Sequence, residues 1–172
     1  MNDKNDCSTL NHPVDAEARL KGVDEFRAHC LDFVEQAQRT LEILSYDLDA
    51  ALYDRQPFLT AVKHLCLRSQ FSRVRILLQN NTRVQKQGHR LVDLARRLPS
   101  SCEIRRPHPD YIDRQENFLV ADQRAYIRWG LSNRYQGYAA PGNRLKAQHL
   151  SNLFDEIWQC SQADSDLRRL YL

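Results

Sequence analysis

The apolar positions of this chain follow two different periods. Over residues 23–37 they recur every three or four positions, which places them on one face of a helix. From Thr40 to Tyr46 they alternate and end at an acidic turn, which favours a strand. The same patterns predict, in chain order, a helix from Pro57 to Cys66, a strand over Arg73–Leu78, a helix carrying Val84, Leu91, Ala95 and Leu98, strands over Cys102–Arg106, Asn117–Ala121 and Arg124–Trp129, a loop over Gly137–Gly142, and a helix carrying Leu150, Leu153, Phe154, Ile157 and Trp158.

The order of these elements predicts an α/β fold. The first three strands alternate with helices, which implies parallel pairing through right-handed crossovers. Only Asp122 and Gln123 separate the next two strands, so this pair must form an antiparallel hairpin. We therefore predict a mixed, largely parallel sheet flanked by helices, with an antiparallel C-terminal hairpin. Residues 1–21 are expected to be a flexible leader, residues 22–160 the domain and residues 161–172 a C-terminal tail.

Length and composition narrow the class of protein. A chain of 172 residues with 42% hydrophobic and 27% charged residues fits one globular domain with its own core. The 5 cysteines are widely spaced and form no C-x-x-C pair, which indicates free thiols in a reducing compartment and argues against a metal site. The sequence contains neither a signal peptide nor an apolar run of about 18 residues. We expect a cytoplasmic protein with no membrane span, no metal and no cofactor.

The charge is distributed unevenly along the chain. Residues 1–60 hold 6 Lys and Arg against 12 Asp and Glu, whereas residues 61–146 hold 17 against 6. A basic middle segment indicates either an anionic ligand or an ordinary charged surface. Fifteen of the 17 lie between positions 73 and 146 and are interspersed with tyrosines and Trp129: Arg73, Arg75, Arg83, Lys86, Arg90, Arg96, Arg97, Arg105, Arg106, Arg114, Arg124, Arg128, Arg134, Arg144 and Lys146.

The predicted hairpin and the helix after it carry a resemblance to a known superfamily. A strand, a tight turn, a strand, a loop and a helix containing Phe154-Asp155-Glu156-Ile157-Trp158 resemble one half of a phospholipase D-type phosphodiesterase. Halves of that kind bear His-x-Lys followed, after four residues, by Asp. Alignment on Asp122 places Gln115 at the histidine position and Asn117 at the lysine position. Gly130-Leu131-Ser132-Asn133 loosely matches the Gly-Ser-x-Asn segment of the superfamily, with an offset one residue too long.

A second resemblance covers the span from Asp47-Leu48-Asp49 to Asp166-Leu167-Arg168-Arg169-Leu170. That span is similar to an uncharacterised bacterial family, some members of which are attached to acetyltransferase-like domains. This resemblance implies an accessory module and supplies no catalytic residue. The segments that carry it are Gly88-His89-Arg90-Leu91, Arg105 to Tyr111 and Phe154 to Trp158.

The substitutions at the motif positions bear directly on catalysis. The phospholipase D reaction, as the resemblance implies it, needs a histidine that attacks phosphorus, a second histidine that protonates the leaving group, and lysines that stabilise negative charge. The amide of Gln115 has no basic lone pair on nitrogen, so it can neither attack nor shuttle protons. Asn117 donates a hydrogen bond but carries no charge. We therefore predict no catalytic residue at the motif positions, and the substitutions favour a non-enzymatic protein over an enzyme.

Polar residues follow the ends of the predicted strands, where open α/β sheets bind ligands. They form the candidate pocket, although Asp47 and Asp49 also suit turn and helix-cap chemistry. His108 is the best candidate among the histidines for a substitute nucleophile, ahead of His89, and a loop histidine bonded to backbone or water is the ordinary alternative. The candidate pocket consists of Asp47, Asp49, Gln79, Asn80, His108, Asp110 and Arg114.

Three functions follow from these observations. The first is a catalytically inactive phospholipase D-like domain that serves as a binding or accessory module for a protein partner or an anionic ligand. The second is a diverged phosphodiesterase or nuclease that uses His108 in a dimer. The third is nucleic-acid binding by the basic middle segment, which lacks a recognised nucleic-acid motif. A homodimer through the sheet edge or the apolar tail is compatible with all three.

Overall fold

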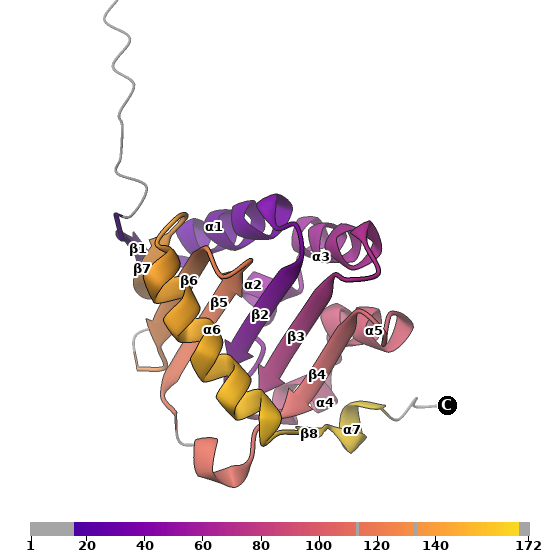
Figure 1. Ribbon diagram of the computed structural model, residues 1–172. Coiled ribbons are helices and arrows are strands. Elements are labelled where there is room, and N and C mark those ends of the chain that lie inside the picture. Colours follow the sequence, from indigo (N-terminus) through magenta and orange to yellow (C-terminus); the bar gives the residue numbers. More distant parts are fainter. Residues whose placement is uncertain (1–15, 113, 133, 169–172) are drawn as a thin grey trace, which may run out of the picture.

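One mixed sheet forms the centre of the molecule in the computed structural model, which describes residues 16–168 except 113 and 133 (Figure 1). Within this part of the chain the sheet has 8 strands in the order β1-β7-β6-β5-β2-β3-β4-β8. The strands are β1 (Ala18–Lys21), β2 (Thr40–Ser45), β3 (Arg73–Leu78), β4 (Cys102–Arg106), β5 (Glu116–Ala121), β6 (Ala125–Gly130), β7 (Gln136–Ala140) and β8 (Gln162–Ala163).

The predicted fold class is confirmed, but the balance of strand pairing differs from the expectation. Parallel pairing joins β2 to β3 and β3 to β4, as the crossovers require. The other five pairs are antiparallel, including the predicted β5–β6 hairpin. The expectation of a largely parallel sheet therefore holds only for the half formed by β2, β3 and β4, because β1, β7 and β8 add antiparallel strands that the hydrophobic pattern did not predict.

One face of the sheet packs against helices that come from the first half of the chain. Phe26, Cys30 and Phe33 of α1 lie buried with Val62 and Leu65 of α3, as their spacing predicts. Helix α5 covers β4 on the same face (Figure 1). The elements that follow one another here are α1 (Val23–Gln36), α2 (Ala50–Tyr53), α3 (Gln56–Arg68), α4 (Thr82–Gln87) and α5 (Arg90–Arg97).

The opposite face is covered by a single long helix, α6 (Arg144–Gln159), which crosses β6, β5 and β2 (Figure 1). Phe154 of α6 packs against Phe118 of β5 in a second apolar cluster. A buried carboxylate lies inside this interface: Glu42 accepts hydrogen bonds from Ser151 Oγ at 2.6 Å and from Arg75 Nη2 at 2.5 Å. Within the described part of the chain, every helix is too short or too polar to traverse a lipid bilayer.

Local structure departs from the predictions in four places. Residues 136–140 form strand β7 rather than a loop, and Ala18–Lys21 of the expected leader form β1, which pairs with it. The predicted third helix is two helices, because Gly88 interrupts it at a positive φ of 74°. The tail contains β8 and α7 (Ser165–Arg168). The rest of the leader, residues 1–15 with Cys7, and the tail residues 169–172 lie outside the described residues.

Candidate functional site

A small pocket opens at the edge of the sheet where β2 ends and β5 begins. The two strands are antiparallel, so Asn117, near the start of β5, lies beside the carboxyl end of β2. The loop after β6 returns to the same edge, because β6 runs antiparallel to β5. This strand-end pocket encloses about 250 Å³ and is lined by Ser45, Tyr46, Asp47, Asp49, Asn117, Trp129, Gly130, Leu131 and Arg134.

The two amide residues of the degenerate motif have different surroundings. Asn117 is buried and lines the strand-end pocket, where its Oδ1 accepts a hydrogen bond from Tyr46 N at 2.8 Å. This bond fixes the side chain on the backbone of the β2–α2 connection. Gln115 is exposed and does not line the pocket, although its backbone oxygen accepts a hydrogen bond from Leu131 N. Only the lysine position of the motif therefore faces the pocket.

Asp122, the third residue of the motif, lies at the other end of β5. Its carboxylate accepts hydrogen bonds from Gln38 N at 2.6 Å, Arg39 N at 2.9 Å and Thr40 N at 2.8 Å. Five residues of strand separate it from Asn117, which corresponds to about 16 Å along the sheet. Asp122 thus fastens the start of β2 and has no contact with the strand-end pocket.

The two aspartates of the strand-end pocket are both engaged. Asp47 Oδ2 lies 2.8 Å from Arg134 Nη2 and 3.2 Å from Arg83 Nη1. Asp49 Oδ1 accepts a hydrogen bond from Ala51 N and so caps α2, while its Oδ2 accepts one from the Tyr135 hydroxyl at 2.6 Å. Cap chemistry was the ordinary interpretation of Asp49, and the structure shows it together with a second, tertiary contact.

Burial and the aspartates together set the charge states around this pocket. Burial, reinforced by the hydrogen bond to Asp49, raises the pKa of Tyr135 to about 12, so its hydroxyl stays protonated and donates. Burial lowers the pKa of Arg134, but the attraction of Asp49 and Asp47 outweighs it, and the net pKa is raised. The pocket lining therefore carries two carboxylates and one guanidinium, with no histidine or lysine.

Gln79 and Asn80 directly follow β3 and do not line the strand-end pocket. Gln79 is buried, and its amide nitrogen donates to Ile112 O at 3.1 Å and to Arg114 O at 3.2 Å. Asn80 Nδ2 donates to the Tyr46 hydroxyl at 3.3 Å, and its Oδ1 accepts from Thr82 N. These residues hold the connections after β3 and before β5, which is a positioning role.

The remaining candidates form a separate, exposed group. His108 is 48% exposed at the start of the 3₁₀ turn η1 (Pro109–Tyr111), where its Nδ1 accepts from Asp110 N and lies 3.3 Å from Asp110 Oδ2. Arg114 pairs with Glu116 at 3.2 Å. None of these side chains lines the strand-end pocket. The structure thus brings Asp47, Asp49 and Asn117 together and leaves His108, Asp110 and Arg114 apart from them.

Sequence reasoning missed two side chains that shape the strand-end pocket, Trp129 and Arg134. Arg134 was counted only among the basic residues, and Trp129 only as a strand residue and as an aromatic interspersed with those basic residues. The signal that could have found them is the two-residue turn at Asp122-Gln123: a tight hairpin returns the end of β6 to the edge where β5 starts. Gly130 and Leu131, from the loosely matching Gly-Leu-Ser-Asn segment, do reach the pocket.

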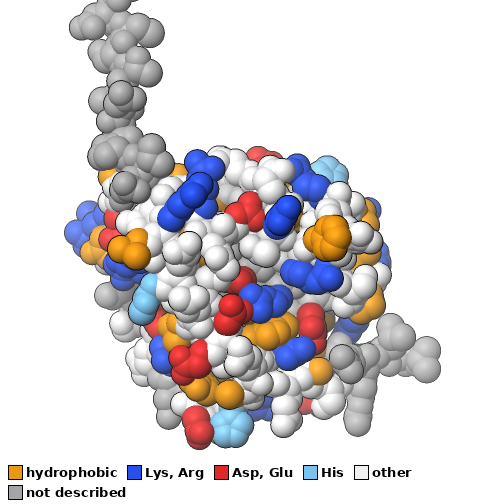
Figure 2. All heavy atoms as spheres, viewed as in Figure 1, with side chains coloured by type: hydrophobic (Ala, Val, Ile, Leu, Met, Phe, Trp, Pro, Cys, Tyr) orange, Lys and Arg blue, Asp and Glu red, His pale blue; other side chains and the backbone are white. Residues whose placement is uncertain are grey.

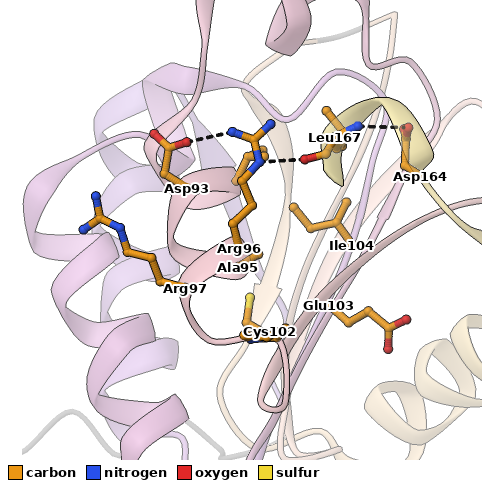
Figure 3. Close-up of a pocket in the computed structure, with 11 residues that line it drawn as sticks. Asp93, Ala95, Arg96, Arg97, Cys102, Glu103, Ile104, Asp164 and Leu167 are labelled. Atoms are coloured by element: carbon orange, nitrogen blue, oxygen red, sulfur yellow. Dashed lines mark hydrogen bonds and ion pairs between the residues drawn. The ribbon is translucent and has the colours of Figure 1, made fainter. Parts of the chain in front are cut away.

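A larger cavity of about 660 Å³ lies at the far edge of the sheet, between α5, β4 and α7 (Figure 3). Arg96 Nε donates to Leu167 O at 2.6 Å across this cavity, and Asp164 Oδ1 accepts from Leu167 N (Figure 3). Cys102 and Ile104 form part of its apolar wall. None of the candidate site residues lines it, and residues 169–172, which follow α7 in the chain, lie outside the described residues.

The fold is an α/β fold like that of solved phospholipase D family structures. One similar structure is Nuc from Salmonella typhimurium, a phospholipase D family member (TM-score 0.60, 11% identity), and another is NucT from Helicobacter pylori (TM-score 0.63, 9% identity). Each match covers 87% of this chain and 99% of the other chain. It also matches TrmBL2, an archaeal chromatin protein that binds DNA (TM-score 0.64, 16% identity), over 91% of this chain but only 57% of that one. At these identities the likeness concerns the fold.

Sequence comparison identifies the family to which the chain belongs. Residues 22–170 match the family described as a domain of unknown function, DUF7931, and the protein belongs to that family. No curated protein sequence matches the chain. The family match includes every helix and strand after β1, and it carries no activity with it.

Proposed function

We propose that this protein is a non-catalytic phospholipase D-like binding module that acts as an accessory to a protein partner. The observation that carries the proposal is the composition of the strand-end pocket. Asn117 stands at the position where the superfamily has lysine and holds its amide oxygen on Tyr46 N. Gln115, at the histidine position, is exposed and cannot act as a nucleophile.

Electrostatics also argue against a phosphodiester in the strand-end pocket. Its lining contributes the negative charges of Asp47 and Asp49 against the positive charge of Arg134. A phosphodiester anion would meet these carboxylates in a partly desolvated site, where like charges repel strongly. Arg134 cannot compensate freely, because it already pairs with Asp47. Transition states of phosphoryl transfer, which concentrate negative charge, would be stabilised poorly here.

Hydrolysis of a chromogenic phosphodiester by purified protein, without added metal, tests this proposal. We expect no rate above that of buffer, and the same result for His108→Ala. Turnover by the wild type that His108→Ala abolishes would overturn the proposal and favour the diverged phosphodiesterase. That alternative also needs a dimer in which the His108 residues of two copies approach one another, which sedimentation of the wild type would reveal.

Nucleic-acid binding is the second candidate function, and the structural likeness to the DNA-binding protein TrmBL2 favours it. Pairing weakens the case, because nine of the fifteen basic residues between positions 73 and 146 form ion pairs with carboxylates: Arg75, Arg83, Arg90, Arg96, Arg105, Arg114, Arg128, Arg134 and Lys146. Binding of this kind falls steeply with salt. A titration with labelled DNA and RNA at low salt that shows no binding would eliminate it.

A further inference from the structure

Three donors from two elements converge on one carboxylate oxygen on the α6 side of the sheet. The oxygen is Oε1 of Glu17, which stands just before β1. It accepts from the Tyr126 hydroxyl at 2.8 Å, Arg128 Nε at 3.0 Å and Lys146 Nζ at 3.0 Å. Tyr126 and Arg128 lie on β6, and Lys146 lies in the first turn of α6. Among the described residues, Glu17 is the only carboxylate that forms an ion pair with Arg128 and Lys146.

The converging donors carry more positive charge than one carboxylate neutralises. Arg128 and Lys146 contribute two cations, and Tyr126 adds a neutral hydroxyl. Burial raises the pKa of Tyr126, and the hydrogen bond to Glu17 adds to this, so the hydroxyl remains a donor. Burial also acts to raise the pKa of Glu17, but the bonds from Arg128, Tyr126 and Lys146 outweigh it and lower that pKa to about 2. The cluster keeps a net charge of one positive unit.

The exposure and packing of these donors suit the binding of an anion. The Tyr126 ring is fully buried, and the side chains of Arg128 and Lys146 are 36% and 38% exposed, so ligand can reach two of the three donors. Arg128 is further fixed by stacking at 4.8 Å over Tyr138, which is 39% exposed. Figure 2 shows Lys and Arg side chains gathered at the end of this face where β1, β7 and the start of α6 lie.

The cluster is separate from the strand-end pocket. Tyr126 and Arg128 point to the α6 side of β6, whereas Trp129, next to them in the strand, packs on the opposite side with α1. The backbone of β1 is held by its ladder with β7 from Ala18 to Lys21, which does not involve the side chain of Glu17. The carboxylate can therefore leave its donors without loss of the strand.

We propose that Tyr126, Arg128 and Lys146 form a binding site for a phosphate group and that Glu17 occupies this site as a built-in competitor. A phosphate offers several acceptor oxygens and up to two negative charges, which matches two cations and a hydroxyl. Because Glu17 is tethered to the site, it competes at an effective concentration on the order of millimolar. The inference does not depend on the absence of catalysis proposed above.

The test is calorimetric titration of the full chain with inorganic phosphate and with two single-stranded oligonucleotides that differ only in a 5′-phosphate. Glu17→Ala should lower the Kd for inorganic phosphate about tenfold or more relative to the wild type. The double variant with Arg128→Gln should lose this gain. A preference for the 5′-phosphorylated oligonucleotide would assign the phosphate to nucleic-acid ends, and binding of inorganic phosphate alone would assign it to a free small anion.

A matched control separates site opening from a change of net charge. Glu25→Ala removes another acidic residue of the same region, an exposed one whose Oε2 accepts from Lys21 N. We expect its Kd for phosphate to equal that of the wild type. An unchanged Kd in Glu17→Ala, or an equal gain in Glu25→Ala, would overturn the proposal. So would loss of the thermal transition in both Glu17→Ala and Glu17→Gln, because Glu17 would then serve to hold the fold.

Discussion

At the scale of single residues, the aligned motif separates into parts with different roles. Asn117 lies in the strand-end pocket, Gln115 is exposed, and Asp122 bonds to the backbone at the start of β2. The alignment gave the positions of these residues in the sequence, but not the distance between them in the fold. The motif spans the whole length of β5, so Asn117 and Asp122 must lie at opposite ends of this strand.

The role of Asp122 predicts a loss of stability when it is removed. Asp122→Ala leaves the N–H groups of Gln38, Arg39 and Thr40 without their acceptor, which should lower the free energy of unfolding by about 1–3 kcal/mol. Urea denaturation measures this difference. Asp110→Ala, at a side chain that is 81% exposed, is the control and should stay within about 0.5 kcal/mol of the wild type. Equal stabilities of the two variants would contradict the assigned role.

Glu42 predicts a pH dependence of stability. Burial raises the pKa of this carboxyl in the folded protein, although Ser151 and Arg75 act to lower it. The unfolded chain has the ordinary value of 4.5, so the folded state binds more protons between 4.5 and the raised pKa. The stabilising contribution of the protonated group is therefore complete below 4.5 and is lost as pH rises through the folded pKa.

Denaturation across this pH range checks the sign. The stability of the wild type relative to Glu42→Gln should fall as pH rises from 4.5 towards neutrality, because only the wild type must ionise a buried group. The attraction of Arg75 grows as Glu42 ionises and opposes this fall, but the net direction of the pKa shift, which already includes it, is upward. Glu35→Gln, on the exposed side of α1, is the matched control. A difference that rises with pH, or stays flat, would contradict the assignment.

At the scale of elements, the hydrophobic pattern predicted the strands that are buried and failed for β7 and β1. Strands β3 and β4 have the predicted bounds, because apolar alternation marks a buried strand well. Strand β7 reads Gln-Gly-Tyr-Ala-Ala, and glycine and alanine give little β signal. The glycine of β7, Gly137, is required by packing against other elements. A local sequence pattern does not reveal such a requirement.

Gly137 offers a direct check of this packing. A Cβ atom there would lie 2.8 Å from Trp129 Cβ, 3.1 Å from Phe26 Cζ, and closer still to Arg128 O. Gly137→Ala must therefore shift β7 or α1 and should cost about 1–3 kcal/mol in thermal or urea unfolding. At Gly130 the nearest atom to a new Cβ would be Gln115 O at 3.6 Å, an ordinary contact. Gly130→Ala should be nearly neutral, and a cost as large as that of Gly137→Ala would refute the packing argument.

At the scale of the whole molecule, topology decides which candidates meet. Asp47, Asp49 and Asn117 come together because the end of β2 and the start of β5 lie side by side in the antiparallel β2–β5 pair, which the sequence analysis did not predict. His108 and Asp110 do not join them, because η1 carries these residues over a separate, exposed turn. Arg134 reaches the same place because the β5–β6 hairpin, which the two-residue link Asp122-Gln123 predicts, returns the chain to the start of β5.

Attack on phosphorus of the phospholipase D type needs a histidine, and the lining of the strand-end pocket in this phospholipase D-like fold contains none. A single-turnover experiment, with the protein in excess over an end-labelled single-stranded oligonucleotide and without metal, detects even very slow cleavage. We predict no product beyond that formed in buffer over a day, for the wild type and for Asn117→Lys alike. Product that accumulates with the wild type and disappears in His108→Ala would contradict the account.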